Sequence, residues 1–218
     1  MSSAASDVYK RQVIMKIICV GKNYLKHIDE LNSSKEDEPV IFLKPDTSII
    51  QKNQPFFIPE FSNEIHYEVE IILKFNRLGK HIESKFSNKY FNQISVGIDF
   101  TARDFQNKFK ERGLPWDISK GFDNSALIGD WKSIKTYDLD NINFRLEKNG
   151  KIVQQSNSKN MIWKIDELIA YASKYFTIKI GDIMFTGTPE GVGVVSEDDV
   201  LEGLSLIHIS EPTRRTTI

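Results

Sequence analysis

His66-Tyr67-Glu68-Val69-Glu70-Ile71-Ile72-Leu73 is a strand-like run in which two acidic side chains alternate with apolar ones. Successive side chains of a strand point to opposite faces, so Glu68 and Glu70 share one face while Val69 and Ile71 face a core. Two carboxylates on one face repel each other, and a bound cation is the commonest reason for such a pair that also does chemistry. The alternative is the solvated face of an amphipathic strand, which an isolated Glu-x-Glu would favour.

A third carboxylate, Asp99, comes near the end of another strand-like run, Ser95-Val96-Gly97-Ile98-Asp99-Phe100. Three carboxylates on two strands predict a site for a divalent cation that prefers oxygen ligands. A zinc site would use cysteine or clustered histidine instead. The chain has one cysteine and four scattered histidines, so zinc is not indicated.

Composition and charge limit the function classes. The formal net charge of −1 leaves no excess of basic residues for binding nucleic acid or an anionic membrane. No apolar run approaches the roughly 20 residues of a membrane-spanning helix. The length suits one domain with a sizeable core, and the lone Cys19 is consistent with a reducing compartment, so we expect a cytoplasmic protein.

The two ends of the chain correspond to one inverted DNA element. Residues 7–12, Asp-Val-Tyr-Lys-Arg-Gln, can be encoded by GATGTGTATAAGAGACAG, and the reverse complement of that string translates to Leu-Ser-Leu-Ile-His-Ile, residues 204–209. This resembles translated sequencing-adapter or transposon-end DNA. We therefore expect residues 1–14 and 204–218 to be non-native tails that pack poorly. Residues 15–203 are then a single catalytic domain, truncated at its C-terminus.

Short β-rich runs dominate the credible domain. Asn149-Gly150 is a two-residue hairpin signal. Helical periodicity is weaker and predicts one helix from Phe105 to Arg112, and another that begins with Asp166 as its N-cap. The expected fold class is mixed α/β, mostly β, with a few short helices. The predicted strands are residues 17–20, 40–43, 68–75, 94–100, 143–148 and 183–186.

Two further groups are candidates for catalysis. His27 and Glu30 are three residues apart, so on a helical turn they are neighbours, and a carboxylate beside an imidazole favours a general base that activates water. An exposed histidine near a surface glutamate is the alternative. Lys120 would supply positive charge to a developing oxyanion if it lies beside the carboxylates. Otherwise it is an ordinary surface lysine.

A glycine-rich turn, Gly187-Thr188-Pro189-Glu190-Gly191-Val192-Gly193, follows the last predicted strand. Such a turn lets backbone N–H groups approach an anion, and Thr188 adds a hydroxyl. It is not a nucleotide-binding P-loop, because no Gly-Lys-Ser/Thr follows the glycines. A structural turn between strands remains the alternative.

Six motifs occur in order along residues 15–203: Gly21-Lys22-Asn23-Tyr24 with His27 and Glu30, Phe42-Leu43-Lys44-Pro45, His66-Tyr67-Glu68-Val69-Glu70, Asp99-Phe100-Thr101-Ala102-Arg103-Asp104, Lys120-Gly121-Phe122-Asp123 and the glycine-rich turn. Together they resemble the fumarylacetoacetate hydrolase superfamily. Gly113-Leu114-Pro115-Trp116 and the His27–Glu30 pair look closest to its small acylpyruvase and oxaloacetate decarboxylase branch.

The resemblance implies a β-roll fold of the fumarylacetoacetate hydrolase type, Mg²⁺ or Mn²⁺ as cofactor, and a homodimer. Lys22 stands where the branch usually has arginine. Its ammonium keeps the positive charge but cannot bind a substrate carboxylate through two parallel N–H groups as a guanidinium does. The roles that the resemblance implies are metal ligation by Glu68, Glu70 and Asp99, water activation by His27 and Glu30 on a mobile lid, oxyanion stabilisation by Lys120, and substrate binding by Lys22, Tyr24, Gln106, Gly187 and Thr188.

The activity implied is metal-dependent C–C bond cleavage of a small 2-oxo acid, by acylpyruvate hydrolysis or oxaloacetate decarboxylation through a pyruvate enolate. Alternatives are isomerisation or hydration of hydroxymuconate-type 2-oxo acids, and a non-catalytic metal-stabilised binding module, which would have no use for His27 and Glu30. A final strand expected after Val200 would be missing, and we therefore expect the strand at 183–186 to keep an exposed edge or an apolar groove.

Overall fold

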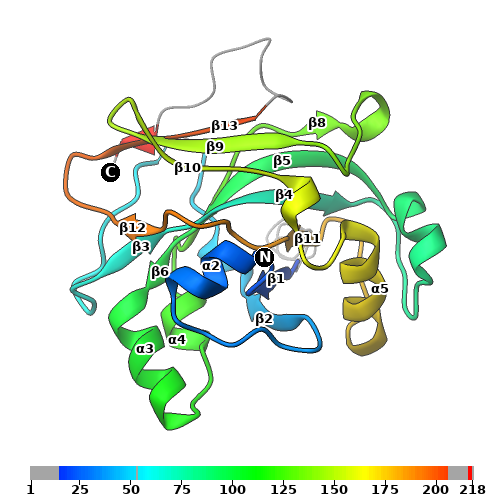
Figure 1. The fold of residues 1–218 in the computed structure, drawn as a ribbon. Helices are drawn as coiled ribbons and strands as arrows, with labels where there is room; N and C mark the ends of the chain where they lie inside the picture. The colour runs from blue at the N-terminus through cyan, green and yellow to red at the C-terminus, as the bar shows by residue number, and fades with distance from the viewer. Residues whose placement is uncertain (1–14, 53, 206–215, 218) are drawn as a thin grey trace, which may run out of the picture.

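Three β-sheets and several short helices make up the computed structural model, which describes residues 15–52, 54–205 and 216–217 (Figure 1). β1 and β11 run parallel, and the other pairs of the central sheet are antiparallel. The central sheet has the order β2 (Val40–Lys44), β1 (Ile17–Gly21), β11 (Ile183–Phe185), β4 (Val69–Phe75), β5 (Phe91–Asp99) and β7 (Ala126–Ile128), with β8 (Lys132–Ser133) also beside β5.

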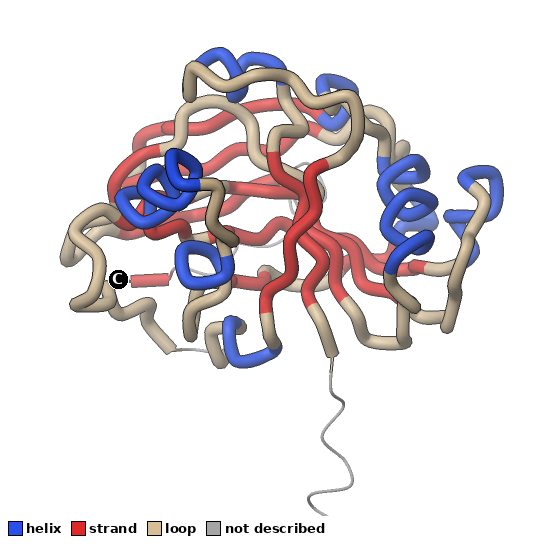
Figure 2. Tube along the Cα trace, turned by 90° about the horizontal axis from the view of Figure 1, so that it is seen from below, coloured by secondary structure: helices blue, strands red, loops and turns tan. Residues whose placement is uncertain are grey.

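Two smaller sheets complete the β structure. One has the order β10 (Lys151–Asn157), β9 (Asn143–Lys148), β13 (Val200–Ser205) and β14 (Thr216–Thr217), and the other has the order β12 (Gly193–Val194), β3 (Ile65–Tyr67) and β6 (Thr101–Ala102). β13 packs closely on β5, because a Cβ added at Gly203 would lie 3.1 Å from a methyl carbon of Val96. The strands curve around the interior, with the helices at the periphery (Figure 2).

The helices are short. α3 and α4 lie together at one side of the central sheet and α5 lies at the other (Figure 1). No described helix is long and apolar enough to cross a membrane. The α-helices are α2 (Leu25–Glu30), α3 (Arg103–Arg112), α4 (Asp117–Lys120) and α5 (Ile165–Tyr175), and the 3₁₀ helices are η1 (Asp46–Ser48), η2 (Ser84–Lys89), η3 (Ile134–Thr136) and η4 (Ser158–Asn160).

Both faces of β4 are covered, and this places charged side chains inside the protein. Ile71 and Leu73 belong to the large core cluster on one face, while Ile72 packs with Cys19 and Phe185 on the other. Full burial of one such aliphatic side chain contributes roughly 1.5–3 kcal/mol. The strand is therefore fixed firmly enough to hold buried carboxylates in place.

The predicted class, mixed α/β and mostly β, is confirmed, and each predicted strand is found with shifts of a few residues at its ends. The helix α3 ends where expected, at Gly113 with a φ of 65°. The predicted N-cap at Asp166 is wrong. α5 begins at Ile165, the Glu167 carboxylate accepts a hydrogen bond from the Lys164 backbone N–H, and Asp166 instead binds the Ser84 hydroxyl.

The expected exposed edge of the strand at 183–186 is also wrong, because β11 lies between β1 and β4. β13 continues past the predicted domain end, since Leu204 and Ser205 pair with β9. The other residues of the predicted tails lie outside the described residues, apart from Thr216 and Thr217 in β14.

Candidate active site

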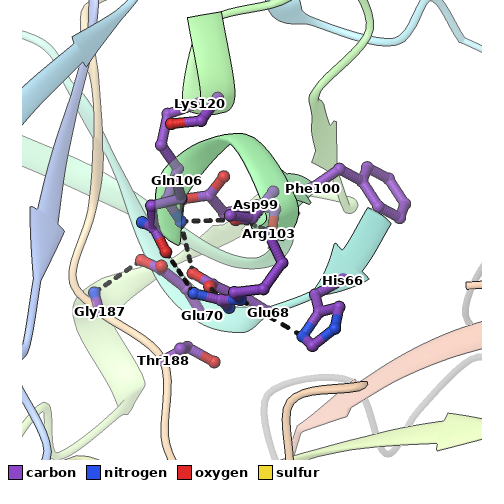
Figure 3. Close-up of polar contacts among 12 residues, drawn as sticks. His66, Glu68, Glu70, Asp99, Phe100, Arg103, Gln106, Lys120, Gly187 and Thr188 are labelled. Atoms are coloured by element: carbon purple, nitrogen blue, oxygen red, sulfur yellow. Dashed lines mark hydrogen bonds and ion pairs between the residues drawn. The ribbon is translucent and has the colours of Figure 1, made fainter. Parts of the chain in front are cut away.

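Three carboxylates converge at the junction of two neighbouring strands (Figure 3). Glu68 lies between β3 and β4, Glu70 lies on β4, and Asp99 ends β5. The backbone N–H of Asp99 donates to the Glu68 carbonyl at 2.8 Å, so the strand pairing itself brings the carboxylates together. One oxygen of each lies within 4.8 Å of the others, and all three residues are buried. The convergence predicted from the strand pattern is therefore confirmed.

Buried cations surround these carboxylates. Lys120 Nζ lies 2.7 Å from Glu68 Oε2 and 2.9 Å from Asp99 Oδ2, and it also donates to the Thr101 hydroxyl at 2.6 Å. Its three ammonium hydrogens are thus directed at protein oxygens. Arg103 binds the other oxygen of Glu68 (Figure 3). Lys120 therefore lies beside the carboxylates and is not a surface lysine.

Lys44 approaches the cluster from β2. Its ammonium lies 2.8 Å from Asp99 Oδ1, but its hydrogens point to the carbonyls of Lys120 and Ser125 and to the Ser125 hydroxyl. Asp99 Oδ1 consequently has no well-aligned hydrogen bond despite complete burial. A buried anionic oxygen without a donor is available as a metal ligand.

Replacement of Lys44 by methionine is expected to destabilise the fold by about 3–5 kcal/mol, the cost of removing one partner from a buried ion pair. Asp99 would lose its nearest cation. Urea unfolding of the metal-free protein measures this. The matched control is Lys85→Met, because Lys85 also pairs with a carboxylate, Glu83, but both side chains are mostly exposed. A Lys44→Met protein as stable as Lys85→Met would contradict the role of Lys44.

The surroundings divide the carboxyl groups by charge. Burial opposes ionisation of Glu68, but Lys120 and Arg103 outweigh it and lower the pKa of that carboxyl. Burial, reinforced by the charges of Asp99 and Glu68, raises the pKa of the Glu70 carboxyl well above its usual range. Ionised Glu70 therefore needs more positive charge than the protein supplies.

The residues present fit a hard divalent cation. All three candidate ligands are carboxylate oxygens, the type that Mg²⁺ and Mn²⁺ prefer. Two Mg²⁺ ligands can be at most about 4.2 Å apart. The three carboxylate oxygens, which lie within 4.8 Å of one another, would therefore have to move inward around an ion. Glu68, Glu70 and Asp99 would hold the ion, and its charge would favour the ionised form of Glu70.

The predicted His27–Glu30 pair forms on α2. His27 Nδ1 lies 3.2 Å from Glu30 Oε2, while the backbone N–H of Gly191 donates to Glu30 Oε1 at 3.0 Å. Burial, partly offset by Glu68 and Glu30, lowers the pKa of His27, so its neutral form is favoured. With Nδ1–H donated to Glu30, Nε2 is the basic nitrogen. The glycine-rich turn thus anchors the carboxylate that orients the imidazole.

The glycine-rich turn also contacts the carboxylate cluster. The backbone N–H of Gly187 donates to Glu70 Oε2 at 2.6 Å, and a Cβ at this position would lie 2.6 Å from the Cβ of Asn23. Only glycine fits there. The Thr188 hydroxyl donates to the Val69 carbonyl at 2.9 Å. This turn therefore holds the start of β4, besides any contact with substrate.

A small pocket of about 30 Å³ opens beside Glu68. A single water needs at least about 10–15 Å³ of such volume, so the pocket is small and an organic acid would need it to widen. Tyr24 does not line this pocket, but burial and then the charge of Glu70 raise the pKa of its hydroxyl, which has no hydrogen-bond partner among the described residues. The predicted site residues that line the pocket are Lys22, His27, Glu68, Gln106, Lys120 and Thr188.

Several contacts at the site come from residues that were given no role from the sequence. Lys44 could have been recognised, because a lysine at the end of an apolar strand run suggests a buried ion pair. Arg103 belongs to the motif of residues 99–104. Gln154 had no local signal, yet its amide accepts from the Val69 N–H at 2.8 Å and donates to the Thr188 hydroxyl at 2.9 Å. Lys110 and Trp116 also line the pocket.

Comparison with known proteins identifies the family. Residues 16–214 match the family model described as fumarylacetoacetate (FAA) hydrolase, C-terminal. The chain belongs to this family. The resemblance inferred from the six motifs is confirmed, and homologues in the fumarylacetoacetate hydrolase family are enzymes.

Individual members show how far the similarity extends. The oxaloacetate tautomerase YcgM of Escherichia coli (strain K12) is 39% identical over 190 residues, which are 86% of this chain and 87% of that protein. A family member from Yersinia pestis CO92 has a structure with a TM-score of 0.89 and 35% identity, and the match covers 94% of this chain and 93% of that one. The fold of this chain is therefore of the fumarylacetoacetate hydrolase type.

A third member was solved with ligands. The fumarylpyruvate hydrolase from Pseudomonas aeruginosa, in complex with Mn²⁺ and pyruvate, has a TM-score of 0.86 and 30% identity, covering 94% of this chain and 89% of that one. Together with the Escherichia coli tautomerase, this structure supports chemistry on small 2-oxo acids for the present chain.

Proposed function

We propose that this protein is a divalent-metal-dependent enzyme that enolises small 2-oxo acids, with keto–enol tautomerisation of oxaloacetate as its first activity. One observation carries the proposal. The buried cluster of Glu68, Glu70 and Asp99 lies beside a pocket that His27 and Lys120 also line. The 39% identical relative named as an oxaloacetate tautomerase supports the choice of reaction.

The cofactor proposed is Mg²⁺ or Mn²⁺, and the Mn²⁺ of the Pseudomonas aeruginosa structure supports this choice. Such an ion supplies Lewis-acid polarisation of the 2-oxo group. His27 Nε2 removes a proton from C3 of the acid, and Glu30 stabilises the resulting imidazolium. Because Asp99 and Glu68 together outweigh the effect of burial and raise the pKa of Lys120, that side chain stays cationic and offsets charge on the 2-oxo oxygen.

C–C bond cleavage is the second candidate activity, and the His27–Glu30 pair favours it. A neutral imidazole that can take a proton from C3 can also take one from water, which acylpyruvate hydrolysis requires. Oxaloacetate decarboxylation needs no activated water. Isomerisation of related 2-oxo acids needs the same proton transfer as tautomerisation. The structure of the bound substrate would therefore determine whether it is tautomerised, isomerised or cleaved.

One assay tests the proposal. The purified protein is given oxaloacetate and acetylpyruvate in the presence of Mg²⁺, Mn²⁺ or a chelator, and both the enol absorbance and the release of pyruvate are recorded. We expect metal-dependent interconversion of the oxaloacetate tautomers to exceed pyruvate release. Turnover that is unchanged by the chelator would contradict the metal role, and pyruvate release without accelerated tautomerisation would make cleavage the main activity.

The acid limb of the pH profile is expected to lie below the ordinary histidine range. Burial lowers the pKa of His27, so the neutral base persists below the usual value of about 6.5. The midpoint of kcat/KM against pH measures this pKa in the free enzyme. Glu30→Gln removes a charge that favours the protonated imidazole, so it should move the midpoint further down. An upward shift would contradict the assignment.

We also propose that the protein is a homodimer, so that its protein partner is a second copy of the chain. Its small-molecule partner is a 2-oxo acid substrate. Exposed apolar side chains in the segment before β3 support an interface, since Phe57 is 73% exposed and Phe61 is 43% exposed. Light scattering after size exclusion tests this. A monomer at micromolar concentration would contradict it.

A further inference from the structure

Three residues of α3 face the pocket at successive turns of the helix. Arg103, Gln106 and Lys110 have i, i+3 and i+7 spacing, which places them along one face, and all three line the pocket. Arg103 contacts Glu68 at the carboxylate cluster. Lys110 is about 10 Å further along the helix axis at about 1.5 Å per residue. Its side chain nevertheless lines the same pocket as Glu68, and the charges of Arg103 and Glu68 both act on it.

Lys110 differs from the other cations of the pocket because it lacks an anionic partner. Arg103 binds Glu68, and the Lys22 ammonium lies 2.6 Å from Glu36 Oε1. Within the described part of the chain, no carboxylate lies at ion-pair distance from Lys110 Nζ. The pocket thus contains one cation whose charge the protein leaves uncompensated.

The surroundings of Lys110 are partly desolvated and bounded by an aromatic ring. Its Nζ lies 5.4 Å from the centroid of the Trp116 ring. Burial, followed by the charge of Arg103, lowers the pKa of Lys110 to about 8. An anion bound beside the ammonium would reverse this effect, because an opposite charge favours the protonated form. Lys110 is therefore suited to bind an anionic group of a ligand.

We propose that Lys110 and Trp116 form the subsite for the second carboxylate of a 2-oxo dicarboxylic acid. The proposal rests on the proposed function, because it takes the 2-oxo group to lie at the carboxylate cluster. Gln106 and Lys110 are about 6 Å apart along the helix axis. The flexible Lys110 side chain can cover that distance and contact the second carboxylate of a four-carbon acid. Trp116 supplies an apolar wall for the carbon chain. A monocarboxylic 2-oxo acid would leave Lys110 unpaired.

Lys110→Met tests the subsite, since methionine keeps an unbranched side chain and removes the charge. Lys108→Met is the matched control, because Lys108 is exposed on the same helix and its Nζ also lies near an aromatic ring, 5.8 Å from the Phe105 centroid. Lys110→Arg retains the charge. For each protein, KM and kcat are measured with Mn²⁺ for oxaloacetate and for its 4-methyl ester, which lacks the second negative charge.

We expect Lys110→Met to raise KM for oxaloacetate about 10- to 100-fold, equivalent to about 1.4–2.8 kcal/mol. Its kcat should hardly change, because the lost contact is equal in ground and transition states. KM for the ester should also hardly change, Lys110→Arg should recover most of the loss, and Lys108→Met should resemble the wild type. Equal effects on acid and ester, or an equal effect of Lys108→Met, would overturn the proposal.

Failure of the proposed function is recognised separately. If the wild-type protein turns over neither compound, that function fails, and the same two compounds then serve as binding probes in titration calorimetry. Tighter binding of the acid than of the ester by the wild type, with the preference lost in Lys110→Met, would still support the subsite. Equal binding of both compounds by the wild type would overturn it.

Discussion

Glu70→Gln is expected to abolish metal-dependent turnover while leaving the fold intact. The substitution keeps the shape of the side chain but removes one of three anionic ligands, and the remaining two bind a divalent ion weakly. Because burial and the neighbouring carboxylates already favour a neutral Glu70 when no ion is bound, the metal-free variant should be at least as stable as the wild type. Glu70→Gln should therefore lose activity without losing stability.

Titration calorimetry with Mn²⁺ and melting curves with and without the ion measure both parts of this prediction. The wild-type Tm should rise with Mn²⁺, since a ligand that binds only the native state stabilises it. The Tm of Glu70→Gln should not. Glu83→Gln is a suitable control, because its carboxylate is mostly exposed. Near wild-type turnover by Glu70→Gln at limiting Mn²⁺ would show that the metal assignment is wrong.

Alanine at the other two ligands should also abolish activity, but with a loss of stability. Glu68→Ala leaves Arg103 and Lys120 without their shared carboxylate, and Asp99→Ala leaves Lys44 unpaired. An uncompensated buried charge costs about 3–5 kcal/mol. Only the Glu70 variant therefore reports on the metal without this complication.

Alternation along one strand predicted the shared direction of two of the three carboxylates. Glu68 and Glu70 flank Val69 in a run that must bury its apolar side chains, so their shared direction follows from backbone geometry. The cluster with Asp99 then follows from the pairing of β4 with β5. Local rules of this kind also account for the strands and for the end of α3 at Gly113.

The cations around the cluster depend on contacts between distant parts of the chain, which no local pattern specifies. Lys44 reaches Ser125, 81 residues away, and Gln154 reaches Val69 across 85 residues. The predicted exposed edge of the strand at 183–186 failed for the same reason. Its two neighbours, β1 and β4, lie within residues 17–75, more than 100 residues before it, and could not be recognised from the strand itself.

His27→Ala is expected to separate the reactions of this site. Tautomerisation and acylpyruvate hydrolysis both need a base, so each should fall by about 10²–10⁴-fold, the usual contribution of a general base. Decarboxylation of oxaloacetate needs no proton abstraction and should fall much less. His81→Ala, at an exposed histidine, is the control. Because Glu30 is held by Gly191 as well as by His27, α2 should stay docked in the variant. Equal losses in all three reactions would indicate a lid or binding function for His27 and not a role as general base.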